Sequence, residues 1–563
     1  MSWQRATTWD ALAAGPVVFH QSPLQIVLYR VEDQVFAIDN RCPHEGYPLA
    51  EGTLDEQCQL TCNWHNWKFR LSDGVCVLGG DHVRAYDVKI EAGDVWIDLS
   101  SPDPQVQQAG ILNGVETAFR KRDTGRICRE LTRLELHHLD PEEALCRAIA
   151  WSHDRLEFGT SHAYAATADW LTLADRYTDD WERRLICLAE AVDHMAHDAL
   201  RRPRYPYATV SAAFSTDAFQ EAVENEDSVA AEGLMHRALA EGLHFDTLEH
   251  DFTRAALQHY NDFGHSLSYV QKTGELIARL GPQCEAWLLP ALTRHLCYAT
   301  REDLIPEFKG ITAALAALPA RAGEQNTPPS LSGLQKGGVR GALSWVTTHL
   351  KTHRVPVLFD ALLQANARNQ VGFDTSYQDS FDRPVNDSVG WLSCTHALTF
   401  SQAVAIQCGK FPDQWSRGLL QMACFVGRNQ RFLDSQIERA EWQVTDVTAY
   451  LQQVREKLLD HGMRDPIFSA HLLKTTMAVE RLINDCQPDT AVWLLAALRR
   501  FLESPFKQKH IRRLARQAID LVARDFRDRQ EWRKRACDGS YQRVPLCCVA
   551  EARALCVAGD MAE

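Results

Sequence analysis

Two short cysteine–histidine pairs constrain the N-terminal part of this chain more than any other feature. Cys42 and His44 form a Cys-x-His pair, and Cys62 and His65 form a Cys-x2-His pair, with seventeen residues between the two pairs. Together they supply two thiolates and two imidazoles, a complete set of four metal ligands. The spacing alone leaves two interpretations open, a tetrahedral zinc site and an iron–sulfur cluster with mixed ligands.

The first hundred residues are typical of a small β domain. The runs 16–19, 25–29 and 35–38 are β-rich and separated by turn residues, and 83–99 alternates in the same manner. Residues 100–104 end the strand pattern, and the polar stretch 105–110 is typical of a linker. We therefore expect a first domain over residues 1–104.

The surroundings of the two pairs resemble the Rieske 2Fe-2S ferredoxin-like family over about residues 17–99. The matching positions are Gly46, Leu49, Gly52, Asn66, Trp67, Lys68, Phe69, Asp73 and Gly74. The resemblance implies that Cys42, His44, Cys62 and His65 hold a 2Fe-2S cluster, with both histidines on one iron. Tyr47 and Trp64 stand where respiratory Rieske proteins carry a further cysteine pair, which implies the oxygenase-associated type. Such a domain transfers single electrons and does no substrate chemistry itself.

Beyond residue 104 the pattern becomes helical. An aspartate followed by proline at positions 140–141 and 465–466 is typical of a helix N-terminus, and amphipathic stretches run over 181–200, 249–280, 389–409 and 481–502. We predict a multidomain protein in which the small all-β domain precedes a large, mainly α-helical catalytic domain over 105–563. The turn-rich segment near 324–340 is expected to be a loop or a subdomain boundary.

Composition narrows the class of protein. Of the 563 residues, 45% are hydrophobic and 24% charged, as in ordinary globular proteins, and the net charge of −14 argues against nucleic-acid or anionic-membrane partners. The N-terminus lacks the pattern of a signal peptide, and no run of apolar residues is long enough to span a membrane. We expect a cytoplasmic protein whose 17 scattered cysteines are mostly reduced thiols.

The helical region resembles the questin oxidase-like family, whose members are largely helical, metal-dependent oxygenases that act on aromatic polyketides. Four segments within about residues 150–480 carry this resemblance, and each contains a histidine: 160–164, 262–266, 395–400 and 471–474. The Asp-x2-His-x4-His iron signature of the usual Rieske oxygenases is not found. The resemblance implies a non-haem metal site formed by His162, His265, His396 and His471 on several helices.

Helical spacing adds further candidates. His471 and Lys474 lie on one stripe of the predicted helix that starts at position 465, so Lys474 is a candidate catalytic group and a fifth ligand, as a neutral amine or a carbamate. The alternative is an ammonium that reaches solvent. His194 is a lesser ligand candidate, and His197 a neighbour of the site or a surface residue. The pair at 349 and 353 favours a solvated face.

We therefore hypothesise an O2-dependent oxidoreductase, a mono- or dioxygenase. Its Rieske cluster would feed a non-haem iron that inserts oxygen into an organic, aromatic or polyketide-like substrate; redox-inert zinc would have no use for the electron carrier. Because phosphate-loop and dinucleotide fingerprints are absent, electrons should come from an external ferredoxin or NAD(P)H-dependent reductase. A homo-oligomer would be one way to bring cluster and iron together.

Two other functions stay open from the sequence. In the first, the helical domain is a non-catalytic docking module, and the Rieske cluster is a tethered electron carrier or redox sensor. In the second, a haem replaces the non-haem iron in a helical oxygenase.

Overall fold

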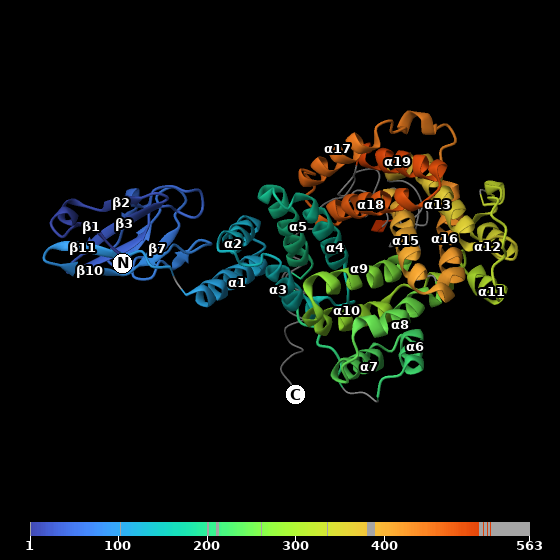
Figure 1. Cartoon of the computed structure of the whole chain (residues 1–563), viewed down its shortest axis with the longest axis horizontal. Helices are drawn as coiled ribbons and strands as arrows, with labels where there is room; N and C mark the ends of the chain where they lie inside the picture. The colour runs from blue at the N-terminus through green and yellow to red at the C-terminus, as the bar shows by residue number, and fades with distance from the viewer. Residues whose placement is uncertain are drawn as a thin grey trace, which may run out of the picture. The chain divides into compact units, whose positions relative to one another are not determined.

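The computed structural model confirms the predicted fold class, a small all-β region followed by a mainly helical one (Figure 1). The structure describes residues 2–101, 103–199, 202–209, 213–259, 262–334, 336–379, 389–505, 511, 515 and 518–519. Residues 1–373 and 392–503 belong to one compact unit, which contains every predicted site residue. As domain limits, residue 104 and the segment near 324–340 stay predictions.

The β region is built from three small antiparallel sheets within residues 2–101. Their strand orders are β1-β11-β10, β2-β3-β4-β9 and β5-β6-β7-β8. The strands are β1 (Trp3–Thr8), β2 (Val17–Gln21), β3 (Leu24–Val31), β4 (Gln34–Asp39), β5 (Thr53–Leu54), β6 (Gln59–Thr61), β7 (Lys68–Arg70), β8 (Cys76–Leu78), β9 (Ala85–Tyr86), β10 (Val88–Glu91) and β11 (Asp94–Asp98).

Strand β3 explains why the sequence run 26–29 is continuously apolar rather than alternating. Val27 and Tyr29 face the hydrophobic cluster that also contains Cys42 and Cys62. Ile26 and Leu28, on the opposite face of the strand, belong to a second cluster. Because both faces of β3 are covered, every position in its centre favours an apolar residue. One face of the strand therefore packs against the two cysteine ligands.

The remainder of the described chain is helical. The helices are α1 (Pro104–Lys121), α2 (Thr124–Leu136), α3 (Glu143–Ser152), α4 (His162–Ala174), α5 (Trp181–Ala199), α6 (Thr216–Glu224), α7 (Ser228–Ala240), α8 (Phe245–Gln258), α9 (His265–Leu280), α10 (Glu285–Tyr298), α11 (Gly310–Ala316), α12 (Gly338–His349), α13 (Val355–Gly372), α14 (Ser376–Asp379), α15 (Trp391–Lys410), α16 (Trp415–Asn429), α17 (Val447–Leu459), α18 (Pro466–Asp485) and α19 (Pro488–Glu503). None of these helices is both long enough and apolar enough to cross a membrane.

The prediction of a linker at 105–110 is wrong, because these residues form the first turns of α1. The Asp103 carboxylate accepts hydrogen bonds from the backbone N–H groups of Gln105 and Val106, at 2.8 and 3.3 Å, and so caps the helix. The polar residues taken for a linker are the mostly solvent-facing start of a helix whose apolar positions, such as Ile111 and Val115, are buried.

Two of the predicted helical stretches are interrupted. The stretch 249–280 contains most of α8 and all of α9, and 481–502 contains the end of α18 and all but the last residue of α19. Gly264 precedes α9 with a left-handed φ of 79°, and Pro488 is the first residue of α19. Both residues favour a new helix start over continuation of the preceding one. The predicted helices at 181–200 and 389–409 are confirmed within two residues by α5 and α15.

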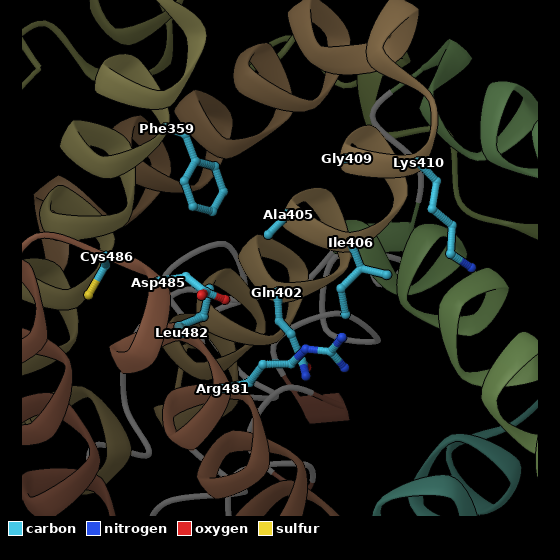
Figure 2. Close-up of a pocket in the computed structure, with 10 residues that line it drawn as sticks. All are labelled: Phe359, Gln402, Ala405, Ile406, Gly409, Lys410, Arg481, Leu482, Asp485 and Cys486. Atoms are coloured by element: carbon cyan, nitrogen blue, oxygen red, sulfur yellow. The ribbon is translucent and has the colours of Figure 1, made fainter. Parts of the chain in front are cut away.

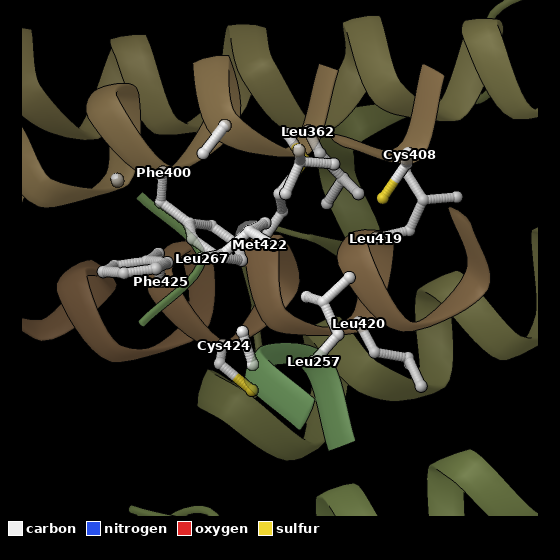
Figure 3. Packing of buried hydrophobic residues seen from close by; sticks show 14 of the residues in the cluster. Leu257, Leu267, Leu362, Phe400, Cys408, Leu419, Leu420, Met422, Cys424 and Phe425 are labelled. Atoms are coloured by element: carbon white, nitrogen blue, oxygen red, sulfur yellow. The ribbon is translucent and has the colours of Figure 1, made fainter. Parts of the chain in front are cut away.

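In the helical core, the start of α9 packs closely against α15. Phe400 of α15 packs against Phe425 of α16, with ring centroids 5.4 Å apart, and Leu267 of α9 belongs to the same cluster (Figure 3). A Cβ atom on Gly264 would lie 2.5 Å from Cδ2 of Phe400. The missing side chain at position 264 therefore permits the close approach of the two helices that carry His265 and His396.

We expect Gly264→Ala to lower the free energy of unfolding more than Gly242→Ala does. Both glycines have a φ of 79°, but a Cβ on Gly242 would meet nothing within 4 Å. The control should lose about 1–2 kcal/mol for its backbone conformation. Gly264→Ala should lose roughly a further 1–3 kcal/mol for the clash with Phe400. Equal losses in chemical denaturation would contradict this account of the helix contact.

Candidate metal centres

The first candidate centre lies between two loops of the β region that fold alike. In the loop after β4, the N–H of Cys42 donates to the carbonyl of Tyr47 at 2.8 Å, and the N–H of Gly46 donates to the carbonyl of Cys42 at 2.7 Å. In the loop after β6, Cys62 bonds to Trp67 and Asn66 to Cys62 in the same pattern, at 2.7 and 2.9 Å. The sequence thus presents two matching cysteine–histidine loops.

Each loop needs a left-handed residue four positions after its cysteine. Gly46 has a φ of 79° and Asn66 a φ of 61°. Glycine adopts this conformation freely, and asparagine tolerates it better than most other residues. These two positions therefore explain part of the residue pattern around the ligands.

The four ligand side chains are arranged as a cluster site requires. Cys42 and Cys62 are both buried, whereas the side chain of His65 is 40% exposed, so the thiols face inward and this imidazole faces outward. The rings of His44 and His65 lie edge to face, with centroids 4.4 Å apart. Burial, together with the neighbouring Cys62, raises the pKa of the Cys42 thiol to about 11 in the cluster-free site. A bound metal would reverse this preference, because it stabilises the thiolate.

Aromatic rings frame the imidazoles. Trp67 stacks on His44 at 4.9 Å between centroids, and Tyr47 stacks on Trp64 at 4.1 Å. The Nδ1 atom of His44 is buried and has no hydrogen-bond partner in the described chain. Two thiols, two adjacent rings and an unpartnered ring nitrogen fit a cluster in which both cysteines bind one iron and both histidines bind the other.

A family model for the Rieske [2Fe-2S] domain matches residues 2–87. The chain belongs to the Rieske [2Fe-2S] family through this domain. The 3-phenylpropionate/cinnamic acid dioxygenase ferredoxin subunit of Escherichia coli K12 is 33% identical over 81 residues, which is 14% of this chain and 76% of the relative. Its counterpart in Shigella boydii is 32% identical over the same length. The Rieske domain is thus homologous to ferredoxin subunits of a dioxygenase and implies a 2Fe-2S cluster.

Solved structures give a matching region of similar extent. The ferredoxin of carbazole 1,9a-dioxygenase from Nocardioides aromaticivorans IC177 is 26% identical, with a TM-score of 0.17, and the match covers 18% of this chain and all of that one. The terminal oxygenase of the same organism is 23% identical with a TM-score of 0.17, and 31% of it is covered. The resemblance of the helical region to questin oxidase-like proteins stays a prediction.

The second candidate centre brings together four histidines that the sequence analysis singled out. His162 and His265 are the first residues of α4 and α9, while His396 and His471 lie in the second turns of α15 and α18. The Nε2 atoms of His162 and His265 are 3.1 Å apart, and those of His396 and His471 are 2.9 Å apart. One ring nitrogen each of His162, His265 and His396 lies within 4.8 Å of the others.

These distances fit two arrangements, a pair of N–H···N hydrogen bonds or several ligands around one ion. Imidazole nitrogens about 2.1 Å from a metal lie roughly 3.0–3.4 Å from each other in octahedral or tetrahedral geometry. His162 contacts both His265 and His471, with ring centroids 4.8 Å away in each case. Separate hydrogen-bonded pairs would not require all the rings to meet at one point.

The tautomer of His471 favours the metal arrangement. Its Nδ1 lies 2.6 Å from the carbonyl oxygen of Ile467, one turn earlier on α18. Because a carbonyl can only accept, Nδ1 carries the proton and Nε2 presents a lone pair. On His162 the Nδ1 atom contacts the hydroxyl of Tyr269 at 3.0 Å, which leaves Nε2 facing the other histidines. Such partners on the far ring nitrogen are typical of histidines that bind metals.

Burial keeps these imidazoles neutral. The pKa values of His162 and His396 lie well below the usual 6.5, chiefly because burial disfavours the charged form. The nearby Lys474 and the other histidines of the group lower these pKa values further. Burial and the nearby Lys474 lower the pKa of His471 to about 3. Neutral imidazoles keep the lone pairs that a metal requires, so this donor set fits an ion near neutral pH.

Lys474 is buried, and the alternative of an ammonium that reaches solvent is wrong. Its side chain is on the stripe of His471, one turn further along α18, and its residue exposure is 5%. Nζ lies 5.7 Å from the centre of the Tyr269 ring, and within the described chain it forms no ion pair with a carboxylate. Burial lowers its pKa to about 8. Its role as a ligand or catalytic group stays a prediction.

The lesser candidates lie outside the histidine group. His194 is buried, and its Nε2 is 3.9 Å from the Asp198 carboxylate, whereas the side chain of His197 is 40% exposed. His349 Nδ1 lies 2.8 Å from the carbonyl of Trp345, and its ring is tilted against that of His353 at 5.3 Å between centroids; both residues are half-buried.

Sequence reasoning missed Tyr269 and the ion pair beside the site. Lys272 donates to Asp169 at 2.8 Å and to Glu275 at 2.8 Å, and Lys272 and Asp169 are both buried. The available signal was helical spacing, because Tyr269 and Lys272 follow His265 by four and seven residues on one stripe of α9. The partner of Lys272 on α4 could not be inferred without the fold.

Replacement of His65 by alanine should remove the Rieske spectrum and leave the helical region folded. The reason is that this imidazole belongs to a cluster site confined to the β region. His20→Ala is the matched control, because His20 is an exposed residue of β2 in the same domain. Electron paramagnetic resonance measures the cluster. A normal Rieske signal in His65→Ala would contradict the ligand assignment.

Lys474→Met should stabilise the metal-free protein at pH 7 by at most about 3 kcal/mol, because burial lowers the Lys474 pKa from 10.5 to about 8. The unfolded state therefore binds more protons between these pH values, and wild-type stability rises with pH across that window. The advantage of the variant should shrink from about pH 8 toward pH 10.5.

The control for this comparison is Lys457→Met, an exposed position of α17. Its difference from wild type should not change with pH in the same window, because the side chain is exposed and no burial is relieved by the substitution. Denaturation at several pH values measures both variants. If the difference in unfolding free energy between Lys474→Met and wild type did not depend on pH, the account of Lys474 as a buried amine with a lowered pKa would be contradicted.

Proposed function

We propose that this protein is an O2-dependent oxidoreductase in which the Rieske cluster supplies electrons to a non-haem iron held by His162, His265, His396 and His471. The observation that carries the proposal is the His471 Nε2, which presents a lone pair because Nδ1 donates to the Ile467 carbonyl, and which lies 2.9 Å from the Nε2 of His396 and near the ring of His162. Iron is favoured over zinc because a redox-inert ion has no use for electrons from a Rieske domain. When bound, the iron would supply the site for O2 reduction.

The residues of the chain have distinct tasks in this proposal. The four imidazoles bind the ion, and the hydroxyl of Tyr269 orients the ring of His162 from 3.0 Å. Lys474 is placed one turn from His471, where a group with a pKa of about 8 can hold or release a proton near neutral pH. His471 and Lys474 are buried and the other three histidines are partly buried, so the site is less polar than water and each of these interactions is stronger there.

The cluster needs an electron donor, and this need indicates the partners of the protein. Because the cluster carries one electron at a time, it must be reduced repeatedly for each O2 consumed. The sequence has no dinucleotide fingerprint, so we propose an external ferredoxin or NAD(P)H-dependent reductase as the donor. The substrate is proposed to be an aromatic or polyketide-like compound, oxidised by a mono- or dioxygenase reaction in the cytoplasm. A homo-oligomer is a further proposal.

One observation favours a second candidate function. The relatives named above are ferredoxin subunits that this chain matches only in its first domain. In that case the protein would be an electron carrier, and the helical region would serve only to dock another protein. Metal content separates the candidates, because a carrier needs no iron beyond its cluster.

His396→Ala and His471→Ala should each lose the iron that is not part of the cluster and retain the 2Fe-2S centre. Loss of one of four imidazoles leaves a vacancy in the donor set, and loss of ligands typically weakens binding by orders of magnitude. His349→Ala is the control, since His349 lies on α12 outside the group. The measurement is iron by mass spectrometry against acid-labile sulfide. Unchanged iron in both site variants would end the proposal.

A further inference from the structure

Two neighbouring cavities open along the helices that carry the histidines. The first has a volume of about 390 Å³ and lies between α13, α15 and the end of α18 (Figure 2). The second has a volume of about 250 Å³ and is lined partly by Asp169, Lys272 and Met477. Gln402 of α15 and Arg481 of α18 line both cavities, so these two side chains form their junction.

Gln402 is a polar residue in a buried position at this junction. It is 5% exposed, and its side-chain amide makes no hydrogen bond to any residue in the described part of the chain. Its amide atoms are not among the fully buried polar atoms without a partner, which agrees with their facing the cavities that the residue lines. Its polar atoms are therefore available to a molecule in either cavity.

Arg481 supplies a partly exposed cationic group at the same junction, loosely paired with the Glu275 carboxylate. Its side chain is 53% exposed, and the carboxylate it reaches, Glu275, is 3.5 Å away. The other cation on the wall, Lys410, is already held by Glu249 at 2.6 Å. Asp485 is the acidic residue of the lining. Figure 2 shows Gln402 on α15 and Arg481 on α18, both in the lining of the first cavity. Their donors suit a single carboxylate, and Asp485 disfavours a second negative charge.

The rest of the first cavity is largely apolar. Phe359 forms one wall, and Ala405, Ile406 and Leu482 also line the cavity. The volume is in the range of pockets that bind small organic molecules. We infer that this cavity binds an aromatic monocarboxylate, with its carboxylate between Arg481 and Gln402 and its ring against Phe359 and Leu482.

The position of the cavity suits an entrance to the histidine group. Gln402 follows His396 by six residues on α15, a rise of about 9 Å. The second cavity is on the histidine side of this junction, since Asp169 and Lys272 each follow a site histidine by seven residues. That the bound carboxylate is the substrate of the histidine site rests on the proposed function; the binding itself does not.

Isothermal titration calorimetry of the full chain with naphthoate tests the binding. Wild type should bind naphthoate and bind neutral naphthalenemethanol at least about tenfold more weakly, because the charged hydrogen bonds are lost. Arg481→Gln should weaken naphthoate binding by about the same factor. Ala405→Trp should abolish binding by filling the cavity. Arg340→Gln, an exposed arginine of α12, should bind as wild type does.

The inference is overturned if wild type does not bind naphthoate, or if Arg481→Gln and Ala405→Trp both bind it as wild type does. Circular dichroism melting shows whether each variant is folded, and Arg481→Lys provides a second test because it keeps the charge without the guanidinium fork. Chelator-treated wild type should bind naphthoate unchanged. Binding in protein that never contains iron beyond the cluster would uphold this site and reject the proposed oxygenase.

Discussion

Four histidines from four helices meet at one site, where burial lowers the pKa of His162, His396 and His471 below its usual value. Two of the helices begin at a site histidine, and the other two carry theirs in the second turn. Their approach depends on Gly264, where a side chain would collide with Phe400. Because burial holds the ring nitrogens neutral, the same packing that forms the core also prepares the donor set for a metal.

The two candidate centres position their ligands in different ways. In the Rieske domain, two short loops repeat one hydrogen-bond pattern, so that ligands close in sequence are set by local backbone geometry. In the helical region the ligands are spread over about three hundred residues of sequence and are set by tertiary packing. The first centre is therefore visible as a motif, whereas the second depends on the whole helical core.

This difference explains what could be predicted from the sequence. The Rieske ligands, the β-to-α change and the four separate histidines were all accessible, the last through short segments resembling another family. The polar start of α1 was mistaken for a linker because composition does not reveal a capping aspartate whose helix buries only one face. Lys474 was ambiguous, since burial depends on neighbouring helices. Tyr269, Lys272 and the Gln402–Arg481 junction needed the fold, because their partners come from distant segments.

The central claim is that the helical region holds iron of its own beside the electron carrier. The most direct measurement is the ratio of iron to acid-labile sulfide in anaerobically purified protein. A 2Fe-2S cluster with one further iron gives about three iron atoms for every two sulfides. That ratio, without a haem absorption band, is the result the account predicts. About two iron atoms for every two sulfides, in protein with a full Rieske signal, would contradict it.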